Sequence, residues 1–329
     1  MTSPILADSV RLADDGVHIL DRRVFPGRQE WVRCATVEDV ARAIEAMVTQ
    51  SSGPYFAALW AMVLAAREAV GRRDPLAHLR RAGERIIATR PTNNHQREAV
   101  RSVLSAVDRT DLVGSVLAAA RAGDERYRAR SRALGEHTAK LLPDNASVLT
   151  HCWADLYLVG LVTAAQEVGK TLTFHCTETR PYQQGARLTA HTLAEMGVET
   201  TVITDNMGAA VLASGRIDAL VTAADRVTLD GHVVNKVGTL GLAIAAHAHR
   251  VPYLAMVHAP DRLAPTAADV PIEYRAGTEV LSAVGVVDPR IRGHYPAFDV
   301  TPPRYVTTVV TDRGPFDPAA LAGYHEEAP

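Results

Sequence analysis

The spacing of apolar residues divides the chain into two parts of different texture. Residues 9–35 contain short alternating runs broken by Asp-Gly and Pro-Gly, a pattern typical of a meander of small strands. A helical period begins after Thr36, which has the side chain of an N-cap, and Asp39 occupies the capping-box position. Further helices are predicted over 53–71, over 74–89 and twice within 96–139, where the second helix is a connector.

From Ala146 onward, short apolar runs alternate with helical runs. The runs predicted as strands are 147–151, 172–176, 199–204, 218–224 and 251–257. This alternation predicts an α/β fold with a parallel, doubly wound sheet and helices on both faces. We therefore predict a smaller, mainly helical N-terminal domain over residues 1–140, carrying a few short strands and the connecting helix. A Rossmann-like domain, predicted to be the catalytic one, follows over residues 141–329.

Polar clusters follow the predicted strands at the points where the strands end. In a parallel sheet, ligands bind at the carboxyl ends of the strands, so these clusters indicate that the second half carries a site. One member, Asp205-Asn206, is adequately explained as a helix N-cap. The clusters are Thr150-His151-Cys152, His175-Cys176-Thr177-Glu178, Thr204-Asp205-Asn206 and Ala224-Asp225-Arg226.

Composition and charge exclude several classes of protein. A chain of 329 residues, 47% hydrophobic and with a net charge of -2, can bury a large core but has no basic surface for nucleic acid. No apolar run reaches the length of a membrane span, and no export signal is visible at the N-terminus. Three cysteines do not make a disulfide framework. We expect a cytoplasmic protein without nucleic-acid or membrane partners.

Two His-Cys dyads, His151-Cys152 and His175-Cys176, raise the question of a metal site. Adjacent residues on a strand point to opposite faces, and no Cys-x-x-Cys spacing occurs, so neither dyad favours a metal. A lone cysteine is usually a buried small apolar residue. Cys152, however, is predicted to open a helix, where the helix dipole would lower the pKa of a thiol. Cys152 is therefore the stronger candidate for chemistry.

Asp225 closes an apolar strand, where its carboxyl group could be tuned for acid–base work, and an ion pair or a cap is the alternative. Asn235 and Lys236 are predicted to begin a helix, and a helix N-terminus beside an ammonium group is a phosphate site. Lys236 is one of three lysines among 35 basic residues. Further candidate anion contacts are Arg90 and Gln184.

Four linked motifs and one in the first half then carry a family resemblance. They are ETRPYQQGARLTAHTL, TDNMGAAVL, AADRVTLDGHVVNKVGT and YPAFDVTP, with ATRPTN before them. Together they resemble the methylthioribose-1-phosphate isomerase family, whose superfamily includes the regulatory subunits of translation initiation factor 2B and ribose-1,5-bisphosphate isomerase. The likeness covers Leu20 to Gly314. It implies a homodimer that acts on a small sugar phosphate in methionine salvage, with an active site between two domains and with no metal or nucleotide cofactor.

The resemblance also assigns roles to residues. The family's catalytic cysteine, in T-H-C-N-A-G, corresponds to Cys152, and its catalytic aspartate, in G-A-D-R, corresponds to Asp225. Its substrate-phosphate contacts correspond to Arg90, Gln184, Asn235 and Lys236.

The chain departs from the family pattern at two places. The loop V-R-G-A-P-A-I-G is replaced by VTQSSGPYF, so Gln50 stands where the family has a phosphate-binding arginine. Ser51 and Ser52 can donate hydrogen bonds there but carry no charge. Loss of a charge-assisted contact costs roughly 1.5–3 kcal/mol, about ten- to a hundredfold in affinity. After Cys152, the family's Asn-Ala-Gly is replaced by Trp153-Ala154-Asp155, which is expected to reshape the pocket.

Two hypotheses fit these observations. The first is an aldose–ketose isomerase that converts a 5-modified ribose 1-phosphate to the ribulose 1-phosphate, through either an enolate or a hydride shift. The second is a non-catalytic sugar-phosphate-binding or regulatory relative. Retention of both Cys152 and Asp225 favours the enzyme. The 5-substituent stays open between methylthio, 5-deoxy and other groups, although Trp153 and Phe56 favour an apolar one.

Overall fold

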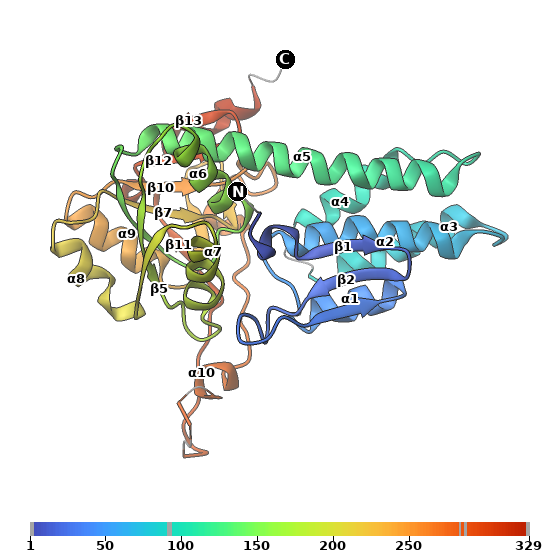
Figure 1. Ribbon diagram of the computed structural model, residues 1–329, viewed down its shortest axis with the longest axis horizontal. Helices are drawn as coiled ribbons and strands as arrows, with labels where there is room; N and C mark the ends of the chain where they lie inside the picture. Colours follow the sequence, from blue (N-terminus) through green and yellow to red (C-terminus); the bar gives the residue numbers. More distant parts are fainter. Residues whose placement is uncertain (1–2, 91–93, 283, 286–287, 327–329) are drawn as a thin grey trace. The chain divides into compact units, whose positions relative to one another are not determined.

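The computed structural model describes residues 3–90, 94–282, 284–285 and 288–326. The chain divides into two compact units, of which the first ends at Ala129 and the second begins at Arg130. The division falls inside the 30-residue helix α5 (Leu112–Leu141), which therefore contributes to both units (Figure 1). The domain boundary expected at residue 140 lies near the end of this same helix.

A three-stranded antiparallel sheet opens the N-terminal unit, and it confirms the predicted meander. Its strands, in spatial order, are β1 (Val10–Ala13), β2 (Gly16–Leu20) and β3 (Trp31–Cys34). Val10 pairs with Ile19, and both side chains are buried, as the alternating pattern requires when one face of a sheet is covered.

Helices form the rest of the N-terminal unit. Thr36 and Asp39 form the predicted capping box, in which the side chain of each accepts the backbone N–H of the other. The central helix α2 is buried on nearly all sides and packs against the three helices around it. Its sequence is accordingly apolar up to Arg67 and Glu68 in the last turn. The helices are α1 (Val37–Glu45), α2 (Gly53–Ala69), α3 (Pro75–Ala88) and α4 (Asn94–Ser105).

A seven-stranded sheet forms the centre of the C-terminal unit. Six of its strands are parallel, and the edge strand β13 is antiparallel to β12. The spatial order is β13-β12-β10-β7-β4-β5-β6. The strands are β4 (Ser147–Thr150), β5 (Thr173–Thr177), β6 (Glu199–Ile203), β7 (Ala219–Ala223), β10 (Tyr253–Met256), β12 (Thr308–Thr311) and β13 (Gly314–Phe316). The predicted Rossmann-like sheet is thereby confirmed.

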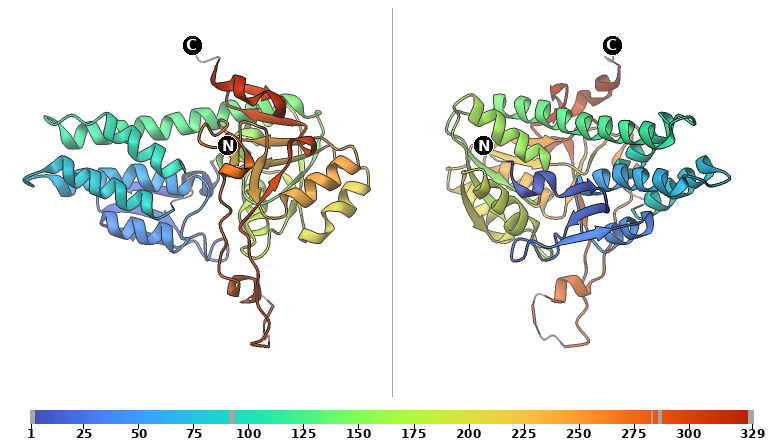
Figure 2. Two further views of the ribbon diagram at one scale, coloured as in Figure 1. Left: turned by 180° about the vertical axis from the view of Figure 1, so that it is seen from behind. Right: turned by 45° about the vertical axis from the view of Figure 1, so that its right-hand side comes forward.

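Helices cover both faces of this sheet (Figure 2). The crossovers from β4 to β5 and from β5 to β6 put α6 and α7 on one face, and the return to β7 and β10 puts α8 and α9 on the other. The helices are α6 (Leu156–Glu167), η2 (Gly185–Thr189), α7 (Ala190–Glu195), α8 (Gly208–Ala213) and α9 (Thr239–Ala248).

A small antiparallel sheet corrects one prediction. Asn235 and Lys236 were expected to begin a helix, but they end strand β9 (Val233–Lys236), which lies between β11 (Phe298–Thr301) and β8 (Arg226–Val227). Helix α9 begins only at Thr239. The prediction was wrong because β9 is held by a strand some sixty residues later, a pairing that local periodicity cannot reveal.

Short helical segments complete the C-terminal unit and the chain's N-terminal end. They are η1 (Ile5–Asp8), η3 (Asp205–Met207), η4 (Ala267–Asp269), α10 (Thr278–Ser282), η5 (Pro303–Tyr305) and η6 (Pro318–His325). Within the described part of the chain, no helix combines the length and apolarity that crossing a membrane requires.

Glycines set the distance between α6 and the C-terminal part of α5. A Cβ atom on Gly160 would lie 2.5 Å from the carbonyl oxygen of Ser131, and one on Gly135 would lie 2.2 Å from the backbone carbon of Gly160. The two helices therefore touch backbone to backbone, and no side chain other than hydrogen fits at this crossing.

We predict that Gly160→Ala lowers the free energy of unfolding by about 1–3 kcal/mol, because the added methyl group forces the helices apart. Urea denaturation measures this change. The control is Gly241→Ala on α9, where an added Cβ meets no atom within 4 Å. That substitution should raise stability by up to about 1 kcal/mol, since alanine is the better helix former. Equal stability of Gly160→Ala and the parent chain would contradict the close crossing.

Candidate active site

The carboxyl edge of the seven-stranded sheet carries the candidate site. β4 and β7 are parallel neighbours at the centre, and the chain leaves β4 toward β5 but leaves β7 toward β10. Ligands of open α/β sheets bind at such a point, where neighbouring crossovers diverge. Cys152 follows β4 and Asp225 follows β7. The sheet thus brings the two predicted catalytic residues to either side of its switch point.

Four residues near this point have a left-handed backbone although none of them is glycine. They are Cys152 (φ 66°), Asp155 (φ 50°), Thr179 (φ 62°) and Gln183 (φ 63°). Each such conformation costs on the order of 1–3 kcal/mol and persists only where the surrounding structure enforces it. The concentration of this strain after β4 and β5 is typical of a functional site.

Two threonines hold the backbone of Cys152 in this conformation. The Cys152 N–H donates to Oγ1 of Thr179 at 2.9 Å, and the hydroxyl of Thr189 donates to the Cys152 carbonyl oxygen. Both threonines are almost completely buried. Neither was predicted from the sequence, because no local pattern shows that a hydroxyl on one strand end satisfies a backbone group on another.

The environment of the Cys152 thiol differs from the prediction. Helix α6 begins only at Leu156, so Cys152 does not occupy the first turn of a helix. Burial raises the pKa of the thiol, whereas the ammonium group of Lys236 lowers it and the carboxylates of Asp205 and Asp225 raise it. The expectation of a pKa lowered by a helix dipole was wrong. Lys236 and the backbone N–H of Trp153 are the groups that favour the thiolate.

Asp225 stands beside this thiol without a partner of its own in the described part of the chain, where its carboxylate makes no hydrogen bond or ion pair. The neighbouring Arg226 pairs with Asp261 at 3.3 Å, so the alternative of an Asp225–Arg226 ion pair is not what the structure contains. The backbone N–H of Asp225 donates to the Val234 carbonyl at 2.9 Å, which joins the end of β7 to β9.

Strand β9 carries Asn235 and Lys236 to the same edge. Lys236 is 9% exposed, and its ammonium group lies 5.0 Å from the ring centre of Phe298 and 5.8 Å from that of Tyr295. These contacts stabilise a buried cation without neutralising it. Asn235 donates from Nδ2 to Oγ1 of Thr239 at 3.0 Å, at the first residue of α9.

The N-terminus of α9 is not available to a phosphate in the way that was expected. The carboxylate of Asp299 accepts the backbone N–H of Gly238 at 2.7 Å and that of Leu240 at 3.2 Å. Burial raises the pKa of Asp299 to about 6, although these hydrogen bonds and Lys236 favour its charged form. Asp299 therefore occupies the helix end, and the anion-binding capacity here rests on Lys236.

Gln184 and Asp205 belong to the same region. Gln184 is buried and directly precedes η2. A Cβ atom on Gly185 would lie 1.8 Å from the Thr177 carbonyl oxygen. The first residue of η2 is therefore in close contact with the end of β5. The carboxylate of Asp205 accepts the backbone N–H groups of Thr179 and Arg180, both at 2.7 Å. The explanation of Asp205 as a helix cap was wrong, because its side chain stabilises the turn after the neighbouring strand.

The two substituted residues after Cys152 are both buried. Trp153 is 4% exposed, and its indole Nε1 has no hydrogen-bond partner within the described residues. Asp155 directly precedes α6, and its side chain does not cap that helix. An indole and a carboxyl group thus lie in the turn between Cys152 and α6, and their effect on a substrate pocket stays a prediction.

The remaining predicted contacts belong to the N-terminal unit. Gln50 and Ser52 are buried and Ser51 is exposed, in the turn before α2. The fully buried Arg22 donates from Nη1 to the Gln50 carbonyl at 2.6 Å, so a guanidinium group lies under this turn. Arg90 follows α3, and its Nη1 lies 3.5 Å from the sulfur of Met47, close before the turn.

The structure thus brings Arg90 and the Gln50 turn together within their unit. Pro91 and Thr92 of the ATRPTN motif lie outside the described residues. Phe56, which was expected near the apolar end of a substrate, is buried and packs edge-on against Tyr127 at 5.2 Å between ring centres.

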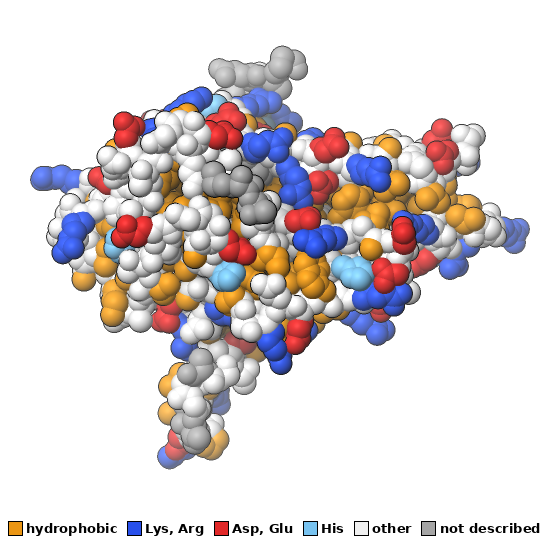
Figure 3. Space-filling model, viewed as in Figure 1, with side chains coloured by type: hydrophobic (Ala, Val, Ile, Leu, Met, Phe, Trp, Pro, Cys, Tyr) orange, Lys and Arg blue, Asp and Glu red, His pale blue; other side chains and the backbone are white. Residues whose placement is uncertain are grey.

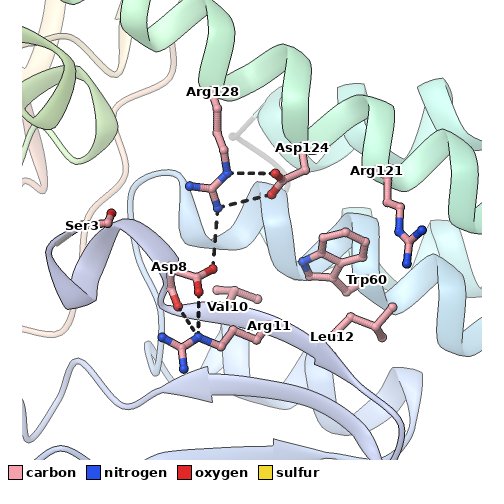
Figure 4. Close-up of a pocket in the computed structure, with 9 residues that line it drawn as sticks. All are labelled: Ser3, Asp8, Val10, Arg11, Leu12, Trp60, Arg121, Asp124 and Arg128. Atoms are coloured by element: carbon pink, nitrogen blue, oxygen red, sulfur yellow. Dashed lines mark hydrogen bonds and ion pairs between the residues drawn. The ribbon is translucent and has the colours of Figure 1, made fainter. Parts of the chain in front are cut away.

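A pocket of about 630 Å³ also lies in the N-terminal unit, on β1, α2 and α5 (Figure 4). Its lining combines apolar side chains, including Trp60, with two ion pairs, Arg11–Asp8 and Arg128–Asp124. None of the predicted site residues lines this pocket. On the face of the molecule shown in Figure 3, acidic and basic side chains are likewise interspersed.

A metal site finds no support in the described ranges, where no three His, Cys, Asp or Glu side chains are grouped to hold an ion. His151 follows β4, whereas His175 lies in the middle of β5, and Cys176 is completely buried.

With the geometry established, comparison with known proteins identifies the family. The model of the Initiation factor 2 subunit family matches residues 41–318. The chain belongs to this family. A relative from Anaeromyxobacter dehalogenans (strain 2CP-C), named methylthioribose-1-phosphate isomerase, is 38% identical over 325 residues, which cover 94% of this chain and 93% of the relative.

Solved structures agree with this membership. The structure of 5-methylthioribose 1-phosphate isomerase from Pyrococcus horikoshii OT3 has a TM-score of 0.87 and 29% identity, over 99% of this chain and 98% of that one. The translation initiation factor eIF-2B, subunit delta, from A. fulgidus has a TM-score of 0.80 and 32% identity, over 94% and 96%. The family resemblance and the fold predicted from the sequence are therefore confirmed.

We predict that Lys236→Met slows alkylation of Cys152 by iodoacetamide at pH 8, because loss of the ammonium group raises the pKa of the thiol. One pKa unit corresponds to about tenfold less thiolate. Mass spectrometry of the labelled peptide gives the rate, and Cys34 and Cys176 are buried and serve as internal references. Lys140→Met, at an exposed position on α5, should leave the rate unchanged. Identical rates for both variants would contradict the electrostatic role of Lys236.

Proposed function

We propose that this protein is an aldose–ketose isomerase. It converts a 5-modified ribose 1-phosphate, with methylthioribose 1-phosphate as the first candidate, to the corresponding ribulose 1-phosphate. The observation that carries the proposal is that Cys152 and Asp225 flank the switch point of the sheet, with Lys236 in electrostatic contact with the thiol. The names of the relatives supply the substrate class.

The substrate itself explains why two acid–base groups are needed. The anomeric oxygen of an aldose 1-phosphate is esterified, so the sugar ring cannot open freely to the aldehyde. Asp225 as a carboxylic acid donates its proton to the ring oxygen, and the ring opens. The resulting carboxylate then accepts the proton of the C2 hydroxyl group.

Cys152 acts at carbon. As a thiolate it removes the C2 proton and returns it to C1 through a cis-phosphoenolate. In the alternative route, hydride moves directly from C2 to C1, and Cys152 only stabilises the transition state. Burial of the thiol favours the neutral form, and Lys236 together with the bound substrate determines how much thiolate forms. Exchange of the transferred hydrogen with deuterated water distinguishes the two routes.

Following the family pattern, we assign phosphate contacts to Gln184, Asn235 and Lys236, and also to Arg90 and the Gln50–Ser52 turn. Lys236 supplies the buried positive charge, and Gln50 supplies an amide where the family has a guanidinium group. Buried Trp153 favours an apolar 5-substituent such as methylthio over a second phosphate.

We also propose that the enzyme works as a homodimer in the cytoplasm and without a metal or nucleotide cofactor. Light scattering of the purified protein tests the dimer. Full turnover after treatment with a chelator tests the absence of a metal requirement.

The decisive assay incubates the purified full-length protein with methylthioribose 1-phosphate, 5-deoxyribose 1-phosphate and ribose 1,5-bisphosphate, with ketose formation as the signal. We predict turnover of the first with kcat/KM of at least about 10⁴ M⁻¹s⁻¹. Cys152→Ala and Asp225→Asn should each lower kcat by at least about a hundredfold without loss of fold. Cys34→Ala, at a buried cysteine in the N-terminal unit, is the control and should retain activity.

Full activity of Cys152→Ala or Asp225→Asn would contradict the assigned roles. If the folded protein converts none of the three sugars but binds one in a calorimetric titration, the non-catalytic alternative is favoured. The observation that supports this alternative is the structural similarity to the A. fulgidus initiation-factor subunit.

We further predict that Gln50→Arg lowers KM for a sugar 1-phosphate by about ten- to a hundredfold, because a guanidinium group adds a charge-assisted hydrogen bond to phosphate. The matched control is Gln50→Met, which removes the amide without adding charge and should raise KM. Steady-state kinetics at two salt concentrations make the measurement. An unchanged KM in Gln50→Arg would show that this turn does not contact the phosphate.

A further inference from the structure

A series of buried hydrogen bonds connects the backbone of Cys152 to Val237, the residue after strand β9. The Cys152 N–H donates to Thr179 Oγ1 at 2.9 Å, and Thr179 Oγ1 lies 3.4 Å from Thr177 Oγ1. Thr177 Oγ1 lies 2.6 Å from Nδ1 of His151, whose Nε2 lies 3.0 Å from the Val237 carbonyl oxygen. The side chains of Thr179, Thr177 and His151 that form this series are each 2% exposed or less.

The donors and acceptors in this series can be assigned one by one. The Val237 carbonyl only accepts, so Nε2 of His151 carries a hydrogen. Burial lowers the pKa of His151, so the ring is neutral and Nδ1 accepts from the Thr177 hydroxyl. The Thr179 hydroxyl hydrogen then goes to Thr177, whose hydroxyl and carbonyl oxygens both lie 3.4 Å away. That leaves a lone pair of Thr179 for the Cys152 N–H.

A second hydroxyl completes the support from the other side. Thr189 donates to the carbonyl oxygen of Cys152, so both polar backbone groups of this residue are held by threonine side chains. Thr179 is itself fixed by Asp205, which accepts its N–H. The left-handed backbone of Cys152, which a β-carbon disfavours, is therefore maintained from two directions.

We propose that Thr179 and Thr189 are positioning residues, which hold the Cys152 thiol in its reactive place through hydrogen bonds to its backbone. Thr177 and His151 orient the Thr179 hydroxyl for this task. The proposal rests on the proposed function of Cys152, because a cysteine without a chemical role would not need a strained and doubly supported backbone.

The test replaces Thr179 with valine, which keeps the shape of the side chain and removes the hydroxyl. Thr179→Ser restores the hydroxyl, and Thr192→Val is the matched control. Thr192 is a completely buried threonine on α7 whose hydroxyl has no hydrogen-bond partner in the described part of the chain. Each variant is assayed for kcat, KM and the rate of Cys152 alkylation by iodoacetamide across pH 6–10.

Thr179→Val should lower kcat by about tenfold or more with KM within about twofold, because the thiol is displaced while the phosphate contacts remain. It should also change the alkylation rate of Cys152 at least about threefold. Thr179→Ser and Thr192→Val should stay within about twofold of the parent protein in every quantity. If the role of Thr179 were merely structural, the substitution would change thermal stability but would not lower kcat selectively while KM stays the same.

Equal kcat and equal alkylation rates for Thr179→Val and Thr192→Val would overturn the proposal. If Thr179→Val does not fold, Thr189→Val takes its place, and the same loss is expected because the Cys152 carbonyl loses its donor. If the protein lacks isomerase activity altogether, the alkylation rates alone decide. The failure of the proposed function and the failure of this inference are then separate results.

Discussion

The parallel pairing of β4 with β7 is the constraint on which the site depends. Parallel strands end at a common edge, so Cys152 and Asp225, which are far apart in sequence, come to the same place only because these two strands are neighbours. β5 and β6 then add Thr179 and Asp205 on one side, and the small sheet adds Lys236 on the other. A different strand order would scatter the same side chains along the edge.

The left-handed turns that follow these strands have an energetic cost, which hydrogen bonds from polar side chains offset. After β4 and β5 the backbone enters left-handed conformations without glycine, and backbone N–H groups are turned away from the sheet. Thr179 Oγ1 accepts the N–H of Cys152, and Asp205 accepts that of Thr179. After β9, Asp299 accepts the N–H of Gly238 in the same way. The side chains of Thr179, Asp205 and Asp299 therefore stabilise backbone groups around the candidate site.

The positive charge near Cys152 comes from the side chain of Lys236 and not from the N-terminus of a helix. Asp299 occupies the start of α9, and burial raises the pKa of the Cys152 thiol, whereas the ammonium group of Lys236 lowers it. In the proposed mechanism this ammonium group interacts with both the substrate phosphate and the developing thiolate. Aromatic rings hold that ammonium group without neutralising it. The proposed use of one compact cation agrees with a lysine at this position, which is one of three lysines among 35 basic residues.

The sequence by itself determined the elements that depend on local pattern. The alternation after Ala146 predicted the parallel sheet, and strand ends located Cys152 and Asp225, because periodicity and strand termination are written in neighbouring residues. The tertiary structure alone decided that Lys236 ends a strand, since its partner strand β11 is distant in sequence. It also decided the roles of Thr179, Thr189 and Asp205, because a side chain that satisfies the backbone of another strand leaves no local signal. The raised pKa of Cys152 has the same origin, since burial is a property of the assembled fold.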